Sequence, residues 1–295
     1  MQVEYDPRPC YELVISLLAF LDNKGNKITD LGPKWLKSVT KQVPDGYGER
    51  YRKLSPLPLV LCRLSPARTA EDFLTWFAGL SKQEIITLLL PRDEKGQLSR
   101  LDVDELHQQW LEGLNIWQRV YFSKVDPEIL AQLTADAQER SRQDWTSEEQ
   151  IERATNGVTL EWPGLERVVL VPQYHYSPWN LNDWGAGEYC IYYPVDVAST
   201  DLASPAPALL RGGRALADEN RLRILRFLGA GTRTFTDVVK FIGLAKSTVH
   251  HHMVILRASG LVRAHVTPDN DRYSLRPGGM LRLAEQFERF FEGDS

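Results

Sequence analysis

Residues 246–262 read KSTVHHHMVILRASGLV, and this stretch decides the fold of the C-terminal part of the chain. With successive helical residues turned by about 100°, Val249, Met253 and Leu256 fall together, which predicts that they face a core. The opposite face carries three polar side chains and a valine: Ser247, His250, His251 and Val254. Gly260 predicts the end of this helix, which we place at residues 246–259.

Two shorter helices precede this one. Asp218 can cap a helix over residues 219–228, because its carboxylate can accept from the free amides of the first turn. Thr234 and Asp237 fit a capping box at the start of a second short helix, which Gly243 closes. The second of these helices is joined to the helix at 246–259 by a tight turn that contains Gly243, which is the signature of a helix-turn-helix.

The segment after the third helix predicts a wing. Residues 261–275 contain two runs typical of strands, separated by the turn residues 268–271, and therefore predict a β-hairpin. Arg272 lies in the second run, from which a side chain could reach a phosphate or the minor groove. Residues 278–291 predict a last helix rich in leucine and phenylalanine, and this much apolar surface suggests a dimer contact.

Residues 215–275 resemble the ArsR/SmtB-type winged-helix repressors. The resemblance rests on LADENRLRIL at 216–225 and on the stretch 246–262, which is similar to the family's Ser-Thr-Val-Ser-His-His-Leu helix and its Gly-Leu-Val ending. It implies a homodimer that binds a palindromic operator in double-stranded DNA and represses until an effector arrives. The sequence departs from the family pattern at three positions, which changes the expected operator: Ala245, His250 and Val254.

Residues 1–200 resemble the uncharacterised N-terminal domain of some longer members of that family. The matching pieces are residues 3–7, 169–172 and 192–194. This resemblance brings no known ligand.

We expect the DNA-contacting side chains on the two helices of the motif and on the wing. Serine and histidine can bond to base edges or phosphates, and the first residues of a recognition helix lie nearest the bases. The predicted set is Thr236, Lys246, Ser247, Thr248, His250, His251, Arg257 and Arg272.

The histidines at 250–252 invite a metal hypothesis, but neighbouring helical residues diverge by about 100° and cannot converge on one ion. The cysteines, Cys10, Cys62 and Cys190, all precede residue 206, and residues 278–295 contain no histidine. We therefore predict no metal site and no cofactor.

Composition predicts two domains. The chain has 295 residues, 43% of them hydrophobic. Residues 206–295 carry a net charge of +5 and the remainder −9, as is typical of a nucleic-acid-binding module joined to a different domain. The proline-rich segment 201–208 predicts a linker between domains at 1–200 and 209–295. We expect an α+β, mainly α, fold: a large helical N-terminal domain with a few strands, then a winged helix-turn-helix.

The N-terminal domain shows amphipathic patterns that predict helices at 12–21, 70–80, 82–90, 104–122 and 127–140. Strands are predicted at 167–172 and 188–193, with an aromatic loop at 173–184 between them. The loop offers candidates for a small-molecule effector site: Tyr174, His175, Tyr176, Trp179 and Trp184. The alternative is that the aromatic residues fill a large core.

The motifs of common enzyme classes are missing from the sequence, and neither His175 nor the carboxylates, Glu12 among them, show a partner at motif spacing. We therefore expect a regulator and not an enzyme. An enzyme or a protein-interaction domain fused to a winged helix is the alternative. The sparse cysteines and the short apolar run at 13–21 lead us to expect a cytoplasmic protein without a membrane segment.

Overall fold

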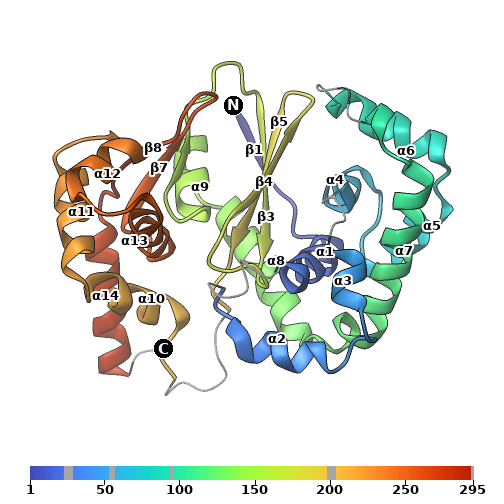
Figure 1. Cartoon of the computed structure of the whole chain (residues 1–295), viewed down its shortest axis with the longest axis horizontal. Helices are drawn as coiled ribbons and strands as arrows, with labels where there is room; N and C mark the ends of the chain where they lie inside the picture. Colours follow the sequence, from blue (N-terminus) through green and yellow to red (C-terminus); the bar gives the residue numbers. More distant parts are fainter. Residues whose placement is uncertain (23–28, 53–56, 94–95, 97, 198–203, 294–295) are drawn as a thin grey trace. The chain divides into compact units, whose positions relative to one another are not determined.

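The computed structural model describes residues 1–22, 29–52, 57–93, 96, 98–197 and 204–293 (Figure 1). Residues 1–143 and 165–197 form one compact unit, the N-terminal unit. Residues 144–164 and 198–295 form the other, the C-terminal unit. The elements are mainly helices, with a few strands in each unit, which confirms the predicted α+β, mainly α, class.

The N-terminal unit is built on a sheet of order β1–β3–β5–β4. Strands β1, β3 and β5 are parallel, and β4 pairs antiparallel with β5 at the edge. The bounds are β1 Gln2–Tyr5, β3 Arg167–Gln173, β4 Leu181–Gly185 and β5 Glu188–Pro194. Strand β4 corrects the predicted loop at 173–184. Its polar residues gave no strand pattern, because an edge strand is only partly buried.

Among the described residues, eight α-helices belong to the same unit. Five of them were predicted to within a few residues, whereas α2, α3 and α4 were not. The bounds are α1 Pro9–Leu21, α2 Gly32–Thr40, α3 Tyr47–Tyr51, α4 Leu57–Leu64, α5 Ala70–Gly79, α6 Lys82–Leu89, α7 Val103–Val120 and α8 Pro127–Ser141. Within the described residues, no helix combines the length and the apolar character that crossing a membrane would require.

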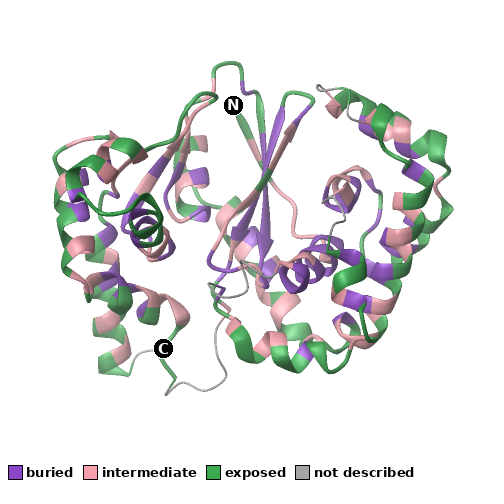
Figure 2. Ribbon diagram, viewed as in Figure 1, coloured by how far each residue is buried: buried purple, intermediate pink, exposed green. Residues whose placement is uncertain are grey.

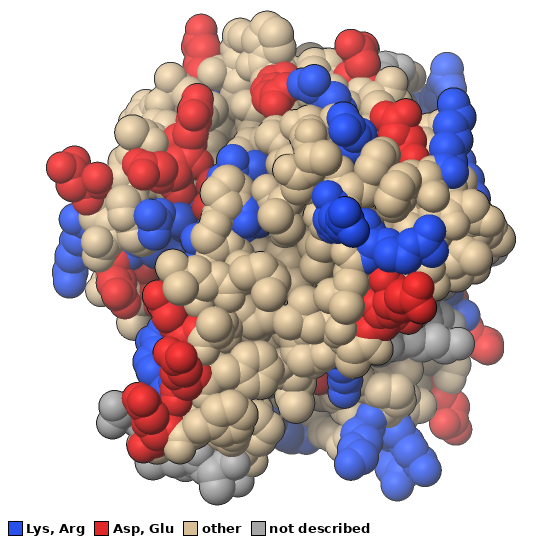
Figure 3. Space-filling model, turned by 90° about the vertical axis from the view of Figure 1, so that its left-hand side faces the viewer, with Lys and Arg blue, Asp and Glu red and all other residues tan. Residues whose placement is uncertain are grey.

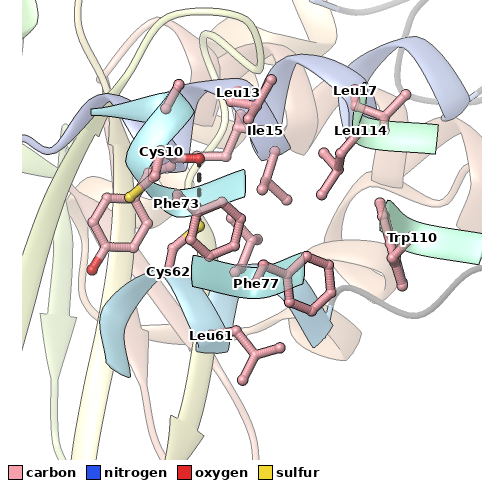
Figure 4. Packing of buried hydrophobic residues seen from close by; sticks show 14 of the residues in the cluster. Cys10, Leu13, Ile15, Leu17, Leu61, Cys62, Phe73, Phe77, Trp110 and Leu114 are labelled. Atoms are coloured by element: carbon pink, nitrogen blue, oxygen red, sulfur yellow. Dashed lines mark hydrogen bonds between the residues drawn. The ribbon is translucent and has the colours of Figure 1, made fainter. Parts of the chain in front are cut away.

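The core of the N-terminal unit lies around α1, which is buried along nearly its whole length (Figure 2). Figure 4 shows Leu13, Ile15 and Leu17 of α1 near side chains from α4, α5 and α7. Trp110 and Trp117 of α7 are fully buried in this cluster. Many of the aromatic residues therefore fill the core, as the alternative interpretation of the composition held.

The C-terminal unit contains the three helices and the hairpin expected from its sequence. Its sheet has the order β2–β7–β8–β6, and β7 and β8 form the wing. The bounds are α9 Ser147–Ala154, β2 Val158–Leu160, α10 Pro207–Leu216, α11 Glu219–Gly229, β6 Arg233–Thr234, α12 Phe235–Ile242, α13 Lys246–Ala258, β7 Val262–Val266, β8 Arg272–Leu275 and α14 Gly279–Glu292.

The predicted N-terminal domain at 1–200 included residues 144–164. In the structure these residues group with the C-terminal unit. Strand β2 pairs in parallel with β7, and Glu152 of α9 holds Arg276 with an Nε–Oε1 distance of 2.7 Å. These contacts join residues more than a hundred positions apart, so no local pattern could reveal them.

The predicted linker at 201–208 is only partly described. Its residues 201–203 lie outside the described residues. Helix α10 begins at Pro207, so the last two residues of the predicted linker are helical. Proline suits this first helical position, where its missing N–H has no partner to lose.

Candidate nucleic-acid interface

The helix-turn-helix consists of α12, a short turn and α13. The Thr234 hydroxyl accepts from the Asp237 amide, and the Asp237 carboxylate accepts from the Thr234 amide, which completes the predicted capping box. Gly243 ends α12 with φ of 73°, a left-handed conformation that glycine adopts without strain. Helix α13 begins at Lys246, and its N-cap residue Ala245 offers no side-chain acceptor.

The two faces of α13 are as the sequence predicts. Val249, Met253 and Leu256 are buried in the core of the C-terminal unit. The predicted contact residues on the outer side are exposed: Lys246, Ser247, Thr248, His250 and His251. Thr236, in the first turn of α12, is exposed as well. Both helices of the motif therefore present polar side chains to the solvent.

The three consecutive histidines have different surroundings. His250 is exposed, with its ring 6.1 Å from that of Phe235. His252 is only 7% exposed, and its Nδ1 lies 3.8 Å from the carboxylate of Asp218, the N-cap of α11. Burial lowers the pKa of His252, against the attraction of Asp218. His252 is therefore part of the packing between α11 and α13, whereas His250 and His251 face outward.

A groove of about 680 Å³ lies between the start of α12, the outer side of α13 and the wing. Four of the predicted contact residues line it: Thr236, Lys246, His250 and Arg257. The hairpin contributes Tyr273 and two carboxylates, Asp269 and Asp271. The groove thus has cations on its helical side and anions on its wing side.

The two predicted arginines, Arg257 and Arg272, differ in their surroundings. Arg257 at the end of α13 lies over the ring of Tyr273, 5.9 Å from its centroid, and lines the groove. Successive strand residues point to opposite faces, so Arg272 points away from the face that Tyr273 presents to the groove. The guanidinium of Arg272 pairs with Glu161, just after β2. Sequence reasoning missed this partner, which is 111 residues away.

The predicted effector residues of the N-terminal unit lie in two places. Trp184 is on β4, with its ring 6.2 Å from that of Tyr189. The other four lie between β3 and β4, where the Tyr176 hydroxyl donates to Asp22 and the Trp179 carbonyl accepts from Gln173. The structure therefore brings together Tyr174, His175, Tyr176 and Trp179, and places Trp184 on the neighbouring strand.

His175 forms a buried chain of hydrogen bonds that the sequence did not show. Its Nδ1 lies 2.5 Å from Glu12 Oε1, and its Nε2 lies 2.7 Å from the Tyr121 hydroxyl. That hydroxyl also accepts from Trp35, at 2.8 Å. Glu12 and His175 are each 1% exposed. No motif spacing could indicate this pairing of Glu12 with His175, because it joins residues 163 positions apart and follows from the tertiary fold alone.

Apolar side chains are exposed on the C-terminal unit. Among the described residues, seven of the ten large exposed hydrophobic side chains belong to it: Leu210, Leu222, Phe241, Leu244, Met280, Leu281 and Phe291. Figure 3, which looks onto the left-hand side of Figure 1, shows a broad central area without charged side chains. The exposed apolar side chains are candidates for burial in an assembly.

A known domain lies in the C-terminal unit. A family model for a helix-turn-helix domain matches residues 216–265. The HTH-type transcriptional regulators CmtR of Mycobacterium bovis and Mycobacterium tuberculosis are 40% identical over 75 residues, 25% of this chain. The match spans 64% of the length of these relatives.

A similar solved structure is a possible transcriptional regulatory protein (fragment 1–100) from Mycobacterium bovis. It is 26% identical and covers 29% of this chain and 91% of its own, with a TM-score of 0.24. The matched sequence at 216–265 spans α11, α12, α13 and most of β7, whose geometry is that of a helix-turn-helix with its first wing strand. The chain therefore carries a helix-turn-helix domain, and part of the chain is similar in sequence to HTH-type transcriptional regulators.

Proposed function

We propose that the chain is an ArsR-like transcriptional repressor that binds a palindromic operator as a homodimer. The observation that carries the proposal is the exposed polar first turn of α13 beside the groove, with Lys246, Ser247 and Thr248 in it. In a helix-turn-helix complex this turn enters the major groove, where its side chains meet base edges and phosphates. The net charge of +5 over residues 206–295 favours association with DNA, whereas the segment 144–164 of the same unit carries −4.

The homodimer is supported by the exposed apolar side chains of the C-terminal unit. A palindromic operator places two half-sites about 34–36 Å apart, so one recognition helix must come from each protomer. On α14, Leu281 is 64% exposed and Phe291 is 75% exposed. We place these two side chains in the dimer contact.

We assign the N-terminal unit the sensing of a non-metal effector. It has its own sheet and its own buried cluster, separate from the core of the C-terminal unit. An effector changes DNA affinity only if it binds the DNA-competent and incompetent states with different affinities. We propose no catalytic role for this unit, because Glu12 and His175 are buried and bond to protein groups. Co-purification of an organic ligand would favour sensing, whereas turnover of a substrate or a co-purified protein would favour the alternatives.

The test is DNA binding by the purified full chain to the duplex upstream of its own gene, over a salt series. The double variant Ser247→Ala/His251→Ala removes two exposed side chains of α13. We expect sequence-specific binding by the wild type and a loss of about tenfold or more in the variant, since each good base contact is worth about 1–3 kcal/mol.

The matched control is Thr75→Ala/Thr87→Ala, which removes two exposed hydroxyls from α5 and α6 of the N-terminal unit. It is expected to bind like the wild type. Equal binding by the wild type and the α13 variant would contradict the assigned reading face, and no salt-dependent binding by any of them would contradict the proposed function.

A further inference from the structure

Glu161 is fixed beside the wing by the added segment 144–164. Its backbone amide donates to the carbonyl of Val266 at 2.9 Å and thereby continues the pairing of β2 with β7. The segment is held further by Gly157, whose carbonyl accepts from Ala264 at 2.8 Å. Glu161 therefore has a defined place on the outer side of β7, although it lies outside the matched helix-turn-helix sequence.

The carboxylate of Glu161 lies among the polar groups of one wing face. It bonds to the guanidinium of Arg272, and its Oε1 lies 2.9 Å from Nδ1 of His265. His265 and Arg272 are partners in the β7–β8 register, and Nε2 of His265 lies 2.9 Å from the Ser274 hydroxyl. The Glu161 carboxylate thus accepts from the guanidinium of Arg272, a cationic side chain of β8.

The charges around the wing make this position significant. The hairpin turn carries Asp269 and Asp271, both exposed, so the tip itself is acidic. The Glu161 and Arg272 side chains are 42% and 47% exposed, and pairs of this kind contribute little to folding. The pair is nevertheless open to an approaching polyanion, and a phosphate oxygen would compete with the Glu161 carboxylate for the same guanidinium.

We propose that Glu161 acts as a built-in substitute for a DNA phosphate on Arg272 and thereby lowers the DNA affinity of the wing. The inference rests on the proposed function and names a residue that sets the affinity of the chain for DNA. DNA that engages the wing must displace the carboxylate or tolerate its charge nearby, and both reduce the number of counterions released. The recognition helix α13 then supplies most of the affinity, and the wing supplies little.

The experiment measures the affinity of the full chain for the same upstream duplex by fluorescence anisotropy at several salt concentrations. Glu161→Gln keeps the shape of the side chain and removes its charge. We expect this variant to bind about fivefold more tightly at low salt, with a slope of log affinity against log salt steeper by about one. In Glu161→Gln/Arg272→Gln the gain should vanish, because the freed guanidinium is its source.

Glu148→Gln is the matched control. It removes the same charge from an exposed side chain in the same segment, at the start of α9, and should leave the affinity unchanged. If Glu161→Gln binds the duplex as tightly as the wild type or more weakly, this inference alone is overturned. An equal gain in Glu148→Gln, or a gain that persists without Arg272, would overturn it too. Absence of DNA binding by all variants would instead overturn the proposed function, and the inference with it.

Discussion

Arg276 shows how a single residue holds the C-terminal unit together. It is 6% exposed, and its guanidinium bonds to Glu152 and to Asn156, both from the segment 144–164. Burial would raise the pKa of Glu152, but the hydrogen bond and charge of Arg276 lower it below its usual value. The paired state of this carboxylate therefore contributes stability above its unfolded pKa, and this contribution is lost as the pH falls below it.

Replacing Glu152 by alanine should lower the free energy of unfolding by about 3 kcal/mol, because Arg276 then stays buried without its counter-ion. Urea unfolding followed by circular dichroism measures the change. Glu148→Ala, an exposed neighbour in α9, should change it by less than about 0.5 kcal/mol. Similar losses in the two variants would contradict the assigned role of the buried pair.

The buried side chain of His252 predicts that the stability of the protein depends on pH. Burial lowers its pKa in the folded state, so the unfolded chain binds a proton more readily. Stability contributed by neutral His252 is thus complete above the unfolded pKa of about 6.5 and is lost as the pH falls toward the folded value. The melting temperature of the wild type should fall between pH 7.5 and 5.5, and less so in His252→Gln. His251→Gln, on the exposed side of α13, should keep the wild-type slope. Identical slopes in all three would refute the argument.

Among the elements, those with both a cap and an apolar period were predictable. Helix α12 begins at the Thr234 capping box, and α11 begins after the Asp218 N-cap, as the sequence predicted. Strand β2 has only three residues and its partner lies more than a hundred positions away, so neither length nor alternation marked it. Helix α9 does have a capping box at Thr146, and that signal could have revealed it.

Helix α13 lacks a side-chain N-cap, and adding one should increase the stability of the protein. Ala245 occupies its N-cap position with extended backbone angles, φ −55° and ψ 140°, and makes no side-chain cap. A serine there can accept from a free amide of the first turn. Ala245→Ser should raise the free energy of unfolding by about 1 kcal/mol. Ala284→Ser, exposed within α14, should not raise it. A destabilised Ala245→Ser variant in denaturant unfolding would contradict the prediction.

For the molecule as a whole, the sequence predicted the fold class and the exposed polar side of α13 but not the composition of each unit. The apolar face of α13 follows from its own periodicity, through Val249, Met253 and Leu256. The partner of Arg272 and the pairing of Glu12 with His175 depend on segments that meet only in the folded chain. Local patterns therefore predicted which surface of α13 is exposed. The pairing of Glu161 with Arg272 on the wing depends on tertiary structure.

The proposed dimer makes a prediction at this scale. Leu281→Glu places a charge on the exposed apolar surface of α14 and should shift the chain toward monomer in light scattering. Its affinity for the duplex should fall about tenfold or more, because one protomer reaches only one half-site. Gln286→Glu adds the same charge elsewhere on α14 and should stay dimeric. A Leu281→Glu protein that remains dimeric would exclude this surface as the contact.

The parallel pairing of β2 with β7 also has a consequence for the order of events on the ribosome. Residues 158–160 leave the exit tunnel long before residues 262–266, with which they pair. At about 5–20 residues per second, a delay of about 100 residues corresponds to roughly 5–20 seconds. During this interval β3 and β5, which are made in between, already provide the N-terminal unit with its sheet. All strands of the N-terminal unit are thus synthesised before β7, the partner of β2.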